Sequence, residues 1–193
     1  MISDPVDQAF LARFIGPTAA PAESPPPVAG GEPRAEPLPS DPVVARLLAK
    51  CPGQWTLLAE RVEAAWAGGD RLVAIAGRTR GEGRSTLVRG LAHVLRARGR
   101  CSGFRTLAAG DRIAADPLDR PALVDAGIWF PPGPVHRGRL ARAASGCQAA
   151  VLVRRASEPP CPAHEAALET LGIRVLGEVE TFSAADPREG VSS

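Results

Sequence analysis

The chain has 193 residues, so we expect one domain with short extensions rather than a large multidomain protein. Hydrophobic residues make up 45% of it, which suffices for a buried core, and the net charge of +2 is too small to indicate nucleic acid or an anionic membrane as a partner. Aromatic residues are only 4% and tyrosine is absent, which excludes an autophosphorylated tyrosine tail and argues against a stacking platform for single-stranded nucleic acid.

Residues 1–40 are rich in proline and poor in long apolar side chains: ten of the 20 prolines lie between Pro5 and Pro42. Such a segment buries too little surface to offset the entropy of ordering. We therefore expect residues 1–40 to be disordered, with 16–40 a flexible linker. For residues 6–15 two interpretations stay open, a disordered end or a short amphipathic helix that docks on a partner.

Residues 41–182 show the alternation of an α/β domain. Asp41-Pro42 is a helix-start signal, and two helices, or one broken at Pro52, precede a short apolar strand over 72–76. Further strands are predicted over 101–108, 121–125, 149–153 and 173–177, and helices over 85–98, 139–147 and 162–171. The pattern predicts a three-layer fold, a mostly parallel sheet with helices on both faces. The tail 183–193 is expected to be disordered.

The loop between the strand 72–76 and the helix 85–98 has the chemistry of a phosphate cradle. Small residues let backbone N–H groups approach phosphate oxygens, a helix N-terminus supplies unpaired donors, and a hydroxyl there is suited to Mg²⁺. These requirements are met by the segment Gly81, Glu82, Gly83, Arg84, Ser85 and Thr86. The P-loop pattern has Gly where this chain has Arg78 and Lys where it has Arg84. A glycine-rich turn without a ligand is the alternative.

Asp125, which follows an apolar strand, is the candidate for orienting Mg²⁺ together with Ser85. An acid that caps a loop at the edge of the sheet is the other interpretation. Isolated histidines at 93, 136 and 164 form no metal site, and the cysteines at 51, 101, 147 and 161 form no CxxC pair.

The segment GEGRST resembles the GEGKST loop of bacterial tyrosine kinases of capsule and exopolysaccharide synthesis, relatives of the MinD/ParA ATPases. The resemblance extends to STLVRGLAHVLRARGR, to PALVDAG and to CQAAVLVRRASEPPCPAHEAALETLGIRVLGEVE, covering about residues 54–180. It implies a P-loop NTPase-like domain that binds ATP and Mg²⁺, with Arg84 and Asp125 in the catalytic positions. Metal binding would fall to Ser85 and Asp125.

The departures from this family are informative. The family carries an aspartate at the end of its second strand, a place that falls near Thr106, where no acid stands; Asp111 comes a few residues late. We therefore expect a weak P-loop ATPase at most, without tyrosine kinase activity. It would act as a nucleotide switch on a homodimer or partner protein, including membrane-bound envelope polysaccharide machinery.

Two other functions compete with this prediction. One is a non-catalytic adaptor that keeps the fold and has lost nucleotide binding; the other, less favoured, is a small P-loop kinase that acts on a metabolite. The first residues lack a basic region followed by an apolar run, and no stretch approaches the roughly 20 apolar residues of a membrane helix. We expect a cytoplasmic protein without membrane insertion.

Overall fold

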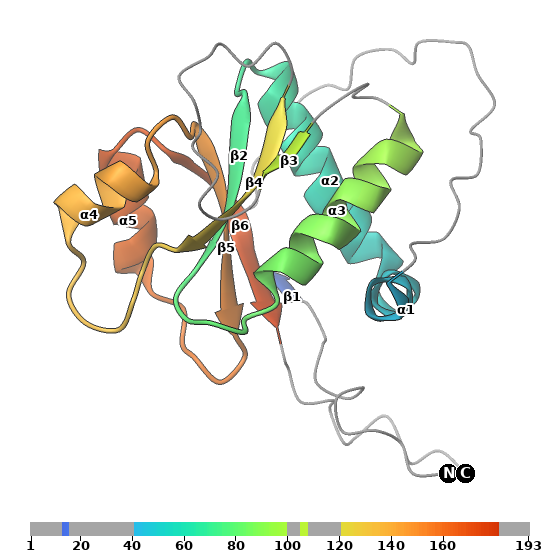
Figure 1. Ribbon diagram of the computed structural model, residues 1–193, viewed down its shortest axis with the longest axis horizontal. Coiled ribbons are helices and arrows are strands. Elements are labelled where there is room, and N and C mark those ends of the chain that lie inside the picture. Colours follow the sequence, from blue (N-terminus) through green and yellow to red (C-terminus); the bar gives the residue numbers. More distant parts are fainter. Residues whose placement is uncertain (1–12, 16–40, 100–104, 108–120, 182–193) are drawn as a thin grey trace.

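A computed structural model describes residues 13–15, 41–99, 105–107 and 121–181 of the chain. It contains a six-stranded sheet in the order β1-β6-β5-β2-β4-β3 (Figure 1). The strands are β1 (Arg13–Ile15), β2 (Leu72–Gly77), β3 (Arg105–Leu107), β4 (Ala122–Ile128), β5 (Ala149–Arg155) and β6 (Arg174–Thr181). The helices are α1 (Pro42–Lys50), α2 (Pro52–Ala67), α3 (Arg84–Arg98), α4 (Arg137–Ala143) and α5 (Pro162–Thr170).

The five strands from β6 to β3 are parallel, which confirms the predicted α/β class. β2 lies between β4 and β5 and is buried along its whole length. This is why its sequence is a continuous apolar run rather than an alternation. A central strand of this kind places the residues that follow it at the carboxyl edge of the sheet, between its neighbours.

Helices cover both faces of the sheet, so the predicted three layers are present (Figure 1). On one face, Val73 and Ile75 of β2 pack with apolar residues of α1, α2 and α3. On the other, Leu72 and Ala74 pack with Leu140 of α4 and with α5. Alternate residues of one strand therefore anchor two separate helical layers.

Asp41 caps α1 as its sequence predicts. Its carboxylate accepts hydrogen bonds from the N–H groups of Val43 at 2.9 Å and Val44 at 3.4 Å, and Pro42 opens the helix. The same carboxylate pairs with Arg89 of α3 at 2.9 Å. Cys51 separates α1 from α2, so two helices precede the core rather than one.

The expectation that residues 1–40 are disordered is wrong for Arg13–Ile15, which form β1. This strand pairs antiparallel with β6, with Phe14 opposite Val179. The physical reason is the open edge of β6, whose backbone N–H and C=O groups need partners. The helical interpretation of residues 6–15 fails for these three residues as well. The rest of 1–40, the tail 183–193 and Asp111 lie outside the described residues.

Among the described helices, none combines the length and the apolar character needed to cross a lipid bilayer.

The close contact between α2 and α3 should make Gly90 sensitive to substitution. A Cβ added at Gly90 would come within 2.6 Å of the Trp55 ring, whereas one added at Gly138 of α4 would meet nothing within 4 Å. Gly90→Ala should therefore lower the free energy of unfolding by about 1–3 kcal/mol through overpacking. Gly138→Ala, the matched control, should leave it unchanged or raise it by up to about 1 kcal/mol. Urea denaturation measures both, and equal effects of the two variants would contradict the packing described.

Candidate functional site

The loop of residues 78–83 joins the central strand β2 to α3 at the carboxyl edge of the parallel sheet. Its start is fixed by Gly77, whose carbonyl accepts hydrogen bonds from the N–H groups of Trp129 at 3.0 Å and Phe130 at 3.2 Å. A Cβ at Gly77 would overlap the Glu82 carboxylate and come within 2.7 Å of Arg84 Nη1. Glycine at this position lets both side chains fold back over the end of β2.

The end of the loop presents backbone donors. Gly81 and Gly83 both have left-handed backbone conformations, with φ of +72° and +80°. α3 then begins at Arg84 without a side-chain cap. The N–H groups of Arg84, Ser85 and Thr86 have no acceptor within the helix because they belong to its first turn. Left-handed residues before a helix N-terminus form a concave set of donors that suits an anion.

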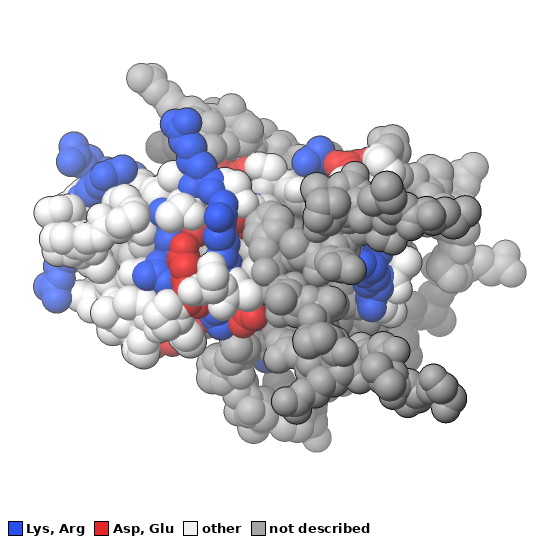
Figure 2. Space-filling view, turned by 90° about the horizontal axis from the view of Figure 1, so that it is seen from below, with Lys and Arg blue, Asp and Glu red and all other residues white. Residues whose placement is uncertain are grey.

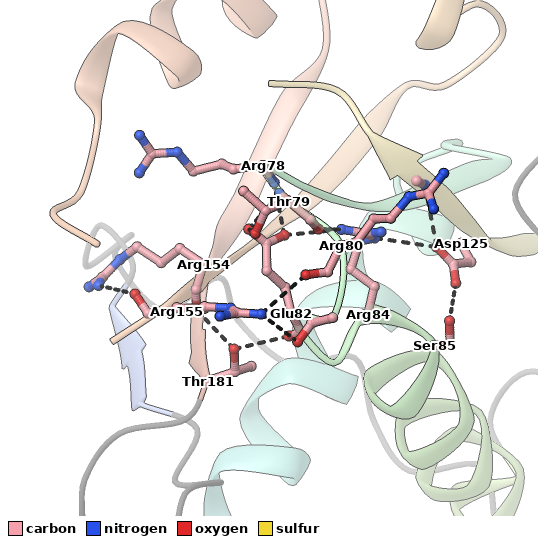
Figure 3. A network of polar contacts seen from close by, with 12 residues as sticks. Arg78, Thr79, Arg80, Glu82, Arg84, Ser85, Asp125, Arg154, Arg155 and Thr181 are labelled. Carbon is pink, nitrogen blue, oxygen red and sulfur yellow. Dashed lines mark hydrogen bonds and ion pairs between the residues drawn. The ribbon is translucent and has the colours of Figure 1, made fainter. Parts of the chain in front are cut away.

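The start of the loop is built around Glu82, whose side chain is fully buried. Its carboxylate accepts hydrogen bonds from the N–H groups of Arg78 at 2.8 Å and Thr79 at 2.7 Å (Figure 3). The hydroxyl of Thr79 donates to it as well, at 3.0 Å. The N–H groups of Arg78 and Thr79 are thus satisfied by a carboxylate from the loop itself, whereas the start of α3 has no side-chain cap.

Arg84 lies across the loop. Its Nη1 donates to the Thr79 carbonyl at 2.6 Å and to Glu82 Oε2 at 3.0 Å. Its Nε lies 3.6 Å from Asp125 Oδ1 and has no hydrogen-bond partner although it is buried. The Arg84 guanidinium is therefore compensated from two sides by the carboxylates of Glu82 and Asp125.

Ser85 and Asp125 come together as the sequence predicts. The Ser85 hydroxyl donates to Asp125 Oδ2 at 2.5 Å, and the N–H of Gly127 donates to Oδ1 at 3.3 Å. The prediction that Asp125 ends its strand is wrong, because β4 continues to Ile128. It stands instead where the register between β2 and β4 shifts, and this irregularity accompanies the approach of its carboxylate to the loop.

The loop is braced from β5 and β6 by residues that the sequence reasoning missed. Thr181 donates from its hydroxyl to the carbonyls of Glu82 at 2.9 Å and Arg154 at 3.0 Å. Arg155 donates to the carbonyl of Arg80 at 3.2 Å. Arg154 is 4% exposed and pairs with Glu178 at 2.9 Å and Glu180 at 2.8 Å. The only sequence signal for this brace is the two glutamates spaced two residues apart on one strand, which places them on one face.

The surface around the loop carries both signs of charge. Figure 2, which views this edge of the sheet, shows arginine side chains interleaved with acidic ones. The Nη1 of Arg78 pairs with Glu158 at 3.2 Å and donates to the Pro159 carbonyl at 3.1 Å. Arg78 is thus engaged with the loop that precedes α5, rather than turned toward the amides of α3.

Ser85 and Asp125 fit a Mg²⁺ ion only if other ligands complete its coordination shell. Among the residues that the structure describes, no group of three or more His, Cys, Asp or Glu could hold a metal ion. A hydroxyl and a carboxylate side by side supply two oxygens. Mg²⁺ commonly takes one or two protein oxygens and completes its shell with water and phosphate oxygens. These residues therefore fit a magnesium ion that arrives with a phosphate ligand.

A scan against protein-family models finds no matching family, and searches of curated proteins and of solved structures find no significant match.

His164 should make the stability of the protein depend on pH. Its ring stacks on Phe130 with centroids 4.1 Å apart, and burial together with the charge of Arg78 lowers its pKa. A histidine whose pKa is lowered in the folded state binds fewer protons there than in the unfolded state. The free energy of unfolding therefore falls as the pH drops below the unfolded-state pKa of ~6.5. His164→Phe keeps a ring for the stack and should reduce the loss of melting temperature between about pH 7 and about pH 5.

His136→Phe is the control, because His136 is exposed at the N-terminus of α4. This variant should keep the pH dependence of the wild-type protein. Identical pH profiles for His164→Phe and the wild type would show that the stacked histidine contributes nothing to it.

Proposed function

We propose that the loop and the first turn of α3 bind the phosphates of a nucleotide, with ATP and Mg²⁺ as the expected ligands. The observation that carries this proposal is the pair of left-handed glycines leading into an uncapped 15-residue helix, with a hydroxyl and a carboxylate beside it. Backbone donors and the helix dipole favour phosphate at such a place. The position at the carboxyl edge of a parallel sheet, where ligands bind in open α/β folds, agrees with it.

Each predicted site residue has a role in this proposal. The backbone of Gly81, Glu82 and Gly83 gives the loop its curvature, and Arg84, Ser85 and Thr86 offer main-chain N–H groups. The guanidinium of Arg84 would contact phosphate after its hydrogen bond to Glu82 breaks. Ser85 and Asp125 hold Mg²⁺, which would compensate the charge of neighbouring phosphate oxygens.

The site is not expected to support efficient phosphoryl transfer. Thr106, on β3, stands where the resemblance would place a second acid, and Arg84 replaces a compact lysine with a bulkier fork. We therefore infer a degenerate P-loop ATPase with weak hydrolysis at most and no tyrosine kinase activity. It would work as a cytoplasmic switch through a homodimer or a partner protein, with envelope polysaccharide machinery as the partner that the resemblance implies.

A second candidate is a non-catalytic adaptor that has lost nucleotide binding. The inward position of Arg84 favours it, because the cation that would meet phosphate is already paired with Glu82 at 3.0 Å. The two candidates differ in one measurable property, which is whether the protein binds a Mg²⁺-nucleotide.

Titration calorimetry and thermal melting with Mg·ATP decide between the two candidates. A ligand at ~100 times its dissociation constant adds roughly 2.7 kcal/mol of stability, enough to raise the melting temperature by several degrees. Arg84→Ala should remove most of this increase. Ser85→Ala, a smaller change, should leave binding less dependent on Mg²⁺.

Arg142→Ala is the matched control, because this exposed arginine of α4 bonds only the Gly138 carbonyl of its own helix among the contacts described. It should bind Mg·ATP as the wild type does. If the wild-type protein shows neither heat of binding nor a change in melting temperature, the switch proposal fails and the adaptor stands.

A further inference from the structure

The buried carboxylate of Glu82 has no ligand-binding role in the function proposed above. It accepts four hydrogen bonds, two from backbone N–H groups, one from a hydroxyl and one from a guanidinium. These four donors satisfy the buried carboxylate, and removing one of them would leave a buried polar group underpaired. Glu82 is therefore an acceptor that the protein itself supplies to the loop.

The loop contains two sets of amides, and Glu82 uses only the first. The N–H groups of Arg78 and Thr79 point to its carboxylate, whereas those of the first turn of α3 have no side-chain cap. The carboxylate thus holds the start of the loop from within (Figure 3), and the second set of amides is the one that the proposed phosphate would use. Glu82 and a bound phosphate are not alternatives for the same amides.

Glu82 and a bound phosphate do compete for the guanidinium of Arg84. Its Nη1 is shared between Glu82 Oε2 and the Thr79 carbonyl, and its side chain is only 13% exposed. A guanidinium fork that reaches toward a phosphate at the start of α3 must give up this charge-assisted bond, at least in part. The affinity for phosphate is then reduced by the strength of the bond that is broken.

We infer that Glu82 competes with the ligand phosphate for Arg84, and so holds the loop formed but weakly receptive until a Mg²⁺-bound polyphosphate displaces it from the guanidinium. This inference rests on the proposed phosphate site and adds to it a residue that sets the affinity. Glu82 acts through Arg84 and does not touch the ligand, so it is a positioning residue.

The test is the dissociation constant of Mg·ATP for Glu82→Gln, measured by calorimetry. The amide oxygen still accepts from a backbone N–H, whereas the charge that holds Arg84 is removed. Binding should become roughly tenfold tighter, because a hydrogen bond to a charged group no longer opposes ligand binding. Introducing Arg84→Met into the same variant should abolish the gain, since the effect passes through the guanidinium.

Glu158→Gln is the matched control. It neutralises a second carboxylate near the loop, but one that pairs with Arg78 at 3.2 Å rather than with Arg84. Its affinity for Mg·ATP should stay at the wild-type value. An equal gain in both single variants would mean that only the overall charge matters, and it would overturn the inference.

The outcomes separate this inference from the proposed function. If the wild type binds and Glu82→Gln binds no tighter, Glu82 is a brace alone and the inference fails while the function stands. If only Glu82→Gln binds, the competition for Arg84 is upheld, but the proposed function fails for the wild-type protein because Mg·ATP does not displace Glu82. If neither binds, both fail.

A second measurement does not depend on the folding of Glu82→Gln. The side-chain Nε–H resonance of Arg84 in the wild-type protein reports the environment of its guanidinium. It should move when Mg·ATP is added, whereas that of Arg154, held by Glu178 and Glu180, should not. An Arg84 signal that stays fixed at the highest ligand concentration would overturn the inference.

Discussion

The pairing of the buried Glu82 carboxylate with the first amides of the loop is the constraint on which the site depends. Without this buried carboxylate, the adjacent N–H groups of Arg78 and Thr79, which follow the central strand, would lose their acceptor. The carboxylate comes from only three and four residues further along the chain, so the loop closes on itself. This closure is followed by the left-handed Gly83 and the start of α3.

The rest of the fold holds this closed loop in place from several sides. Gly77 leaves room for the two side chains that fold back, and Thr181 reaches the Glu82 carbonyl from the last described residue of β6. Arg154 links β5 to two glutamates on β6. A parallel sheet brings these residues together because the carboxyl ends of its strands lie at one edge. The site is thus a product of the topology as well as of the loop sequence.

The sequence predicts the strand, loop and helix around residues 72–98 well, since an apolar run, a glycine cluster and an amphipathic helix are local signals. It also places Ser85 and Asp125 in one site, and the structure joins them at 2.5 Å. It does not reveal that Glu82, within a motif expected to work through its backbone, points its side chain into the loop. That contact requires a closed turn with left-handed glycines, which no local pattern of apolar and polar residues encodes. The pairing of β1 with β6 was missed for a similar reason, because three residues carry too little pattern to specify a distant partner.

We propose that the amides at the start of α3 donate hydrogen bonds to phosphate while those of Arg78 and Thr79 stay with Glu82. Amide proton and nitrogen chemical shifts recorded during a titration with Mg·ADP test it most directly. The account predicts the largest changes at Gly83, Arg84, Ser85 and Thr86, with Arg78 and Thr79 nearly unchanged. A titration that leaves all of these signals in place, or that moves only the two amides held by Glu82, would contradict it.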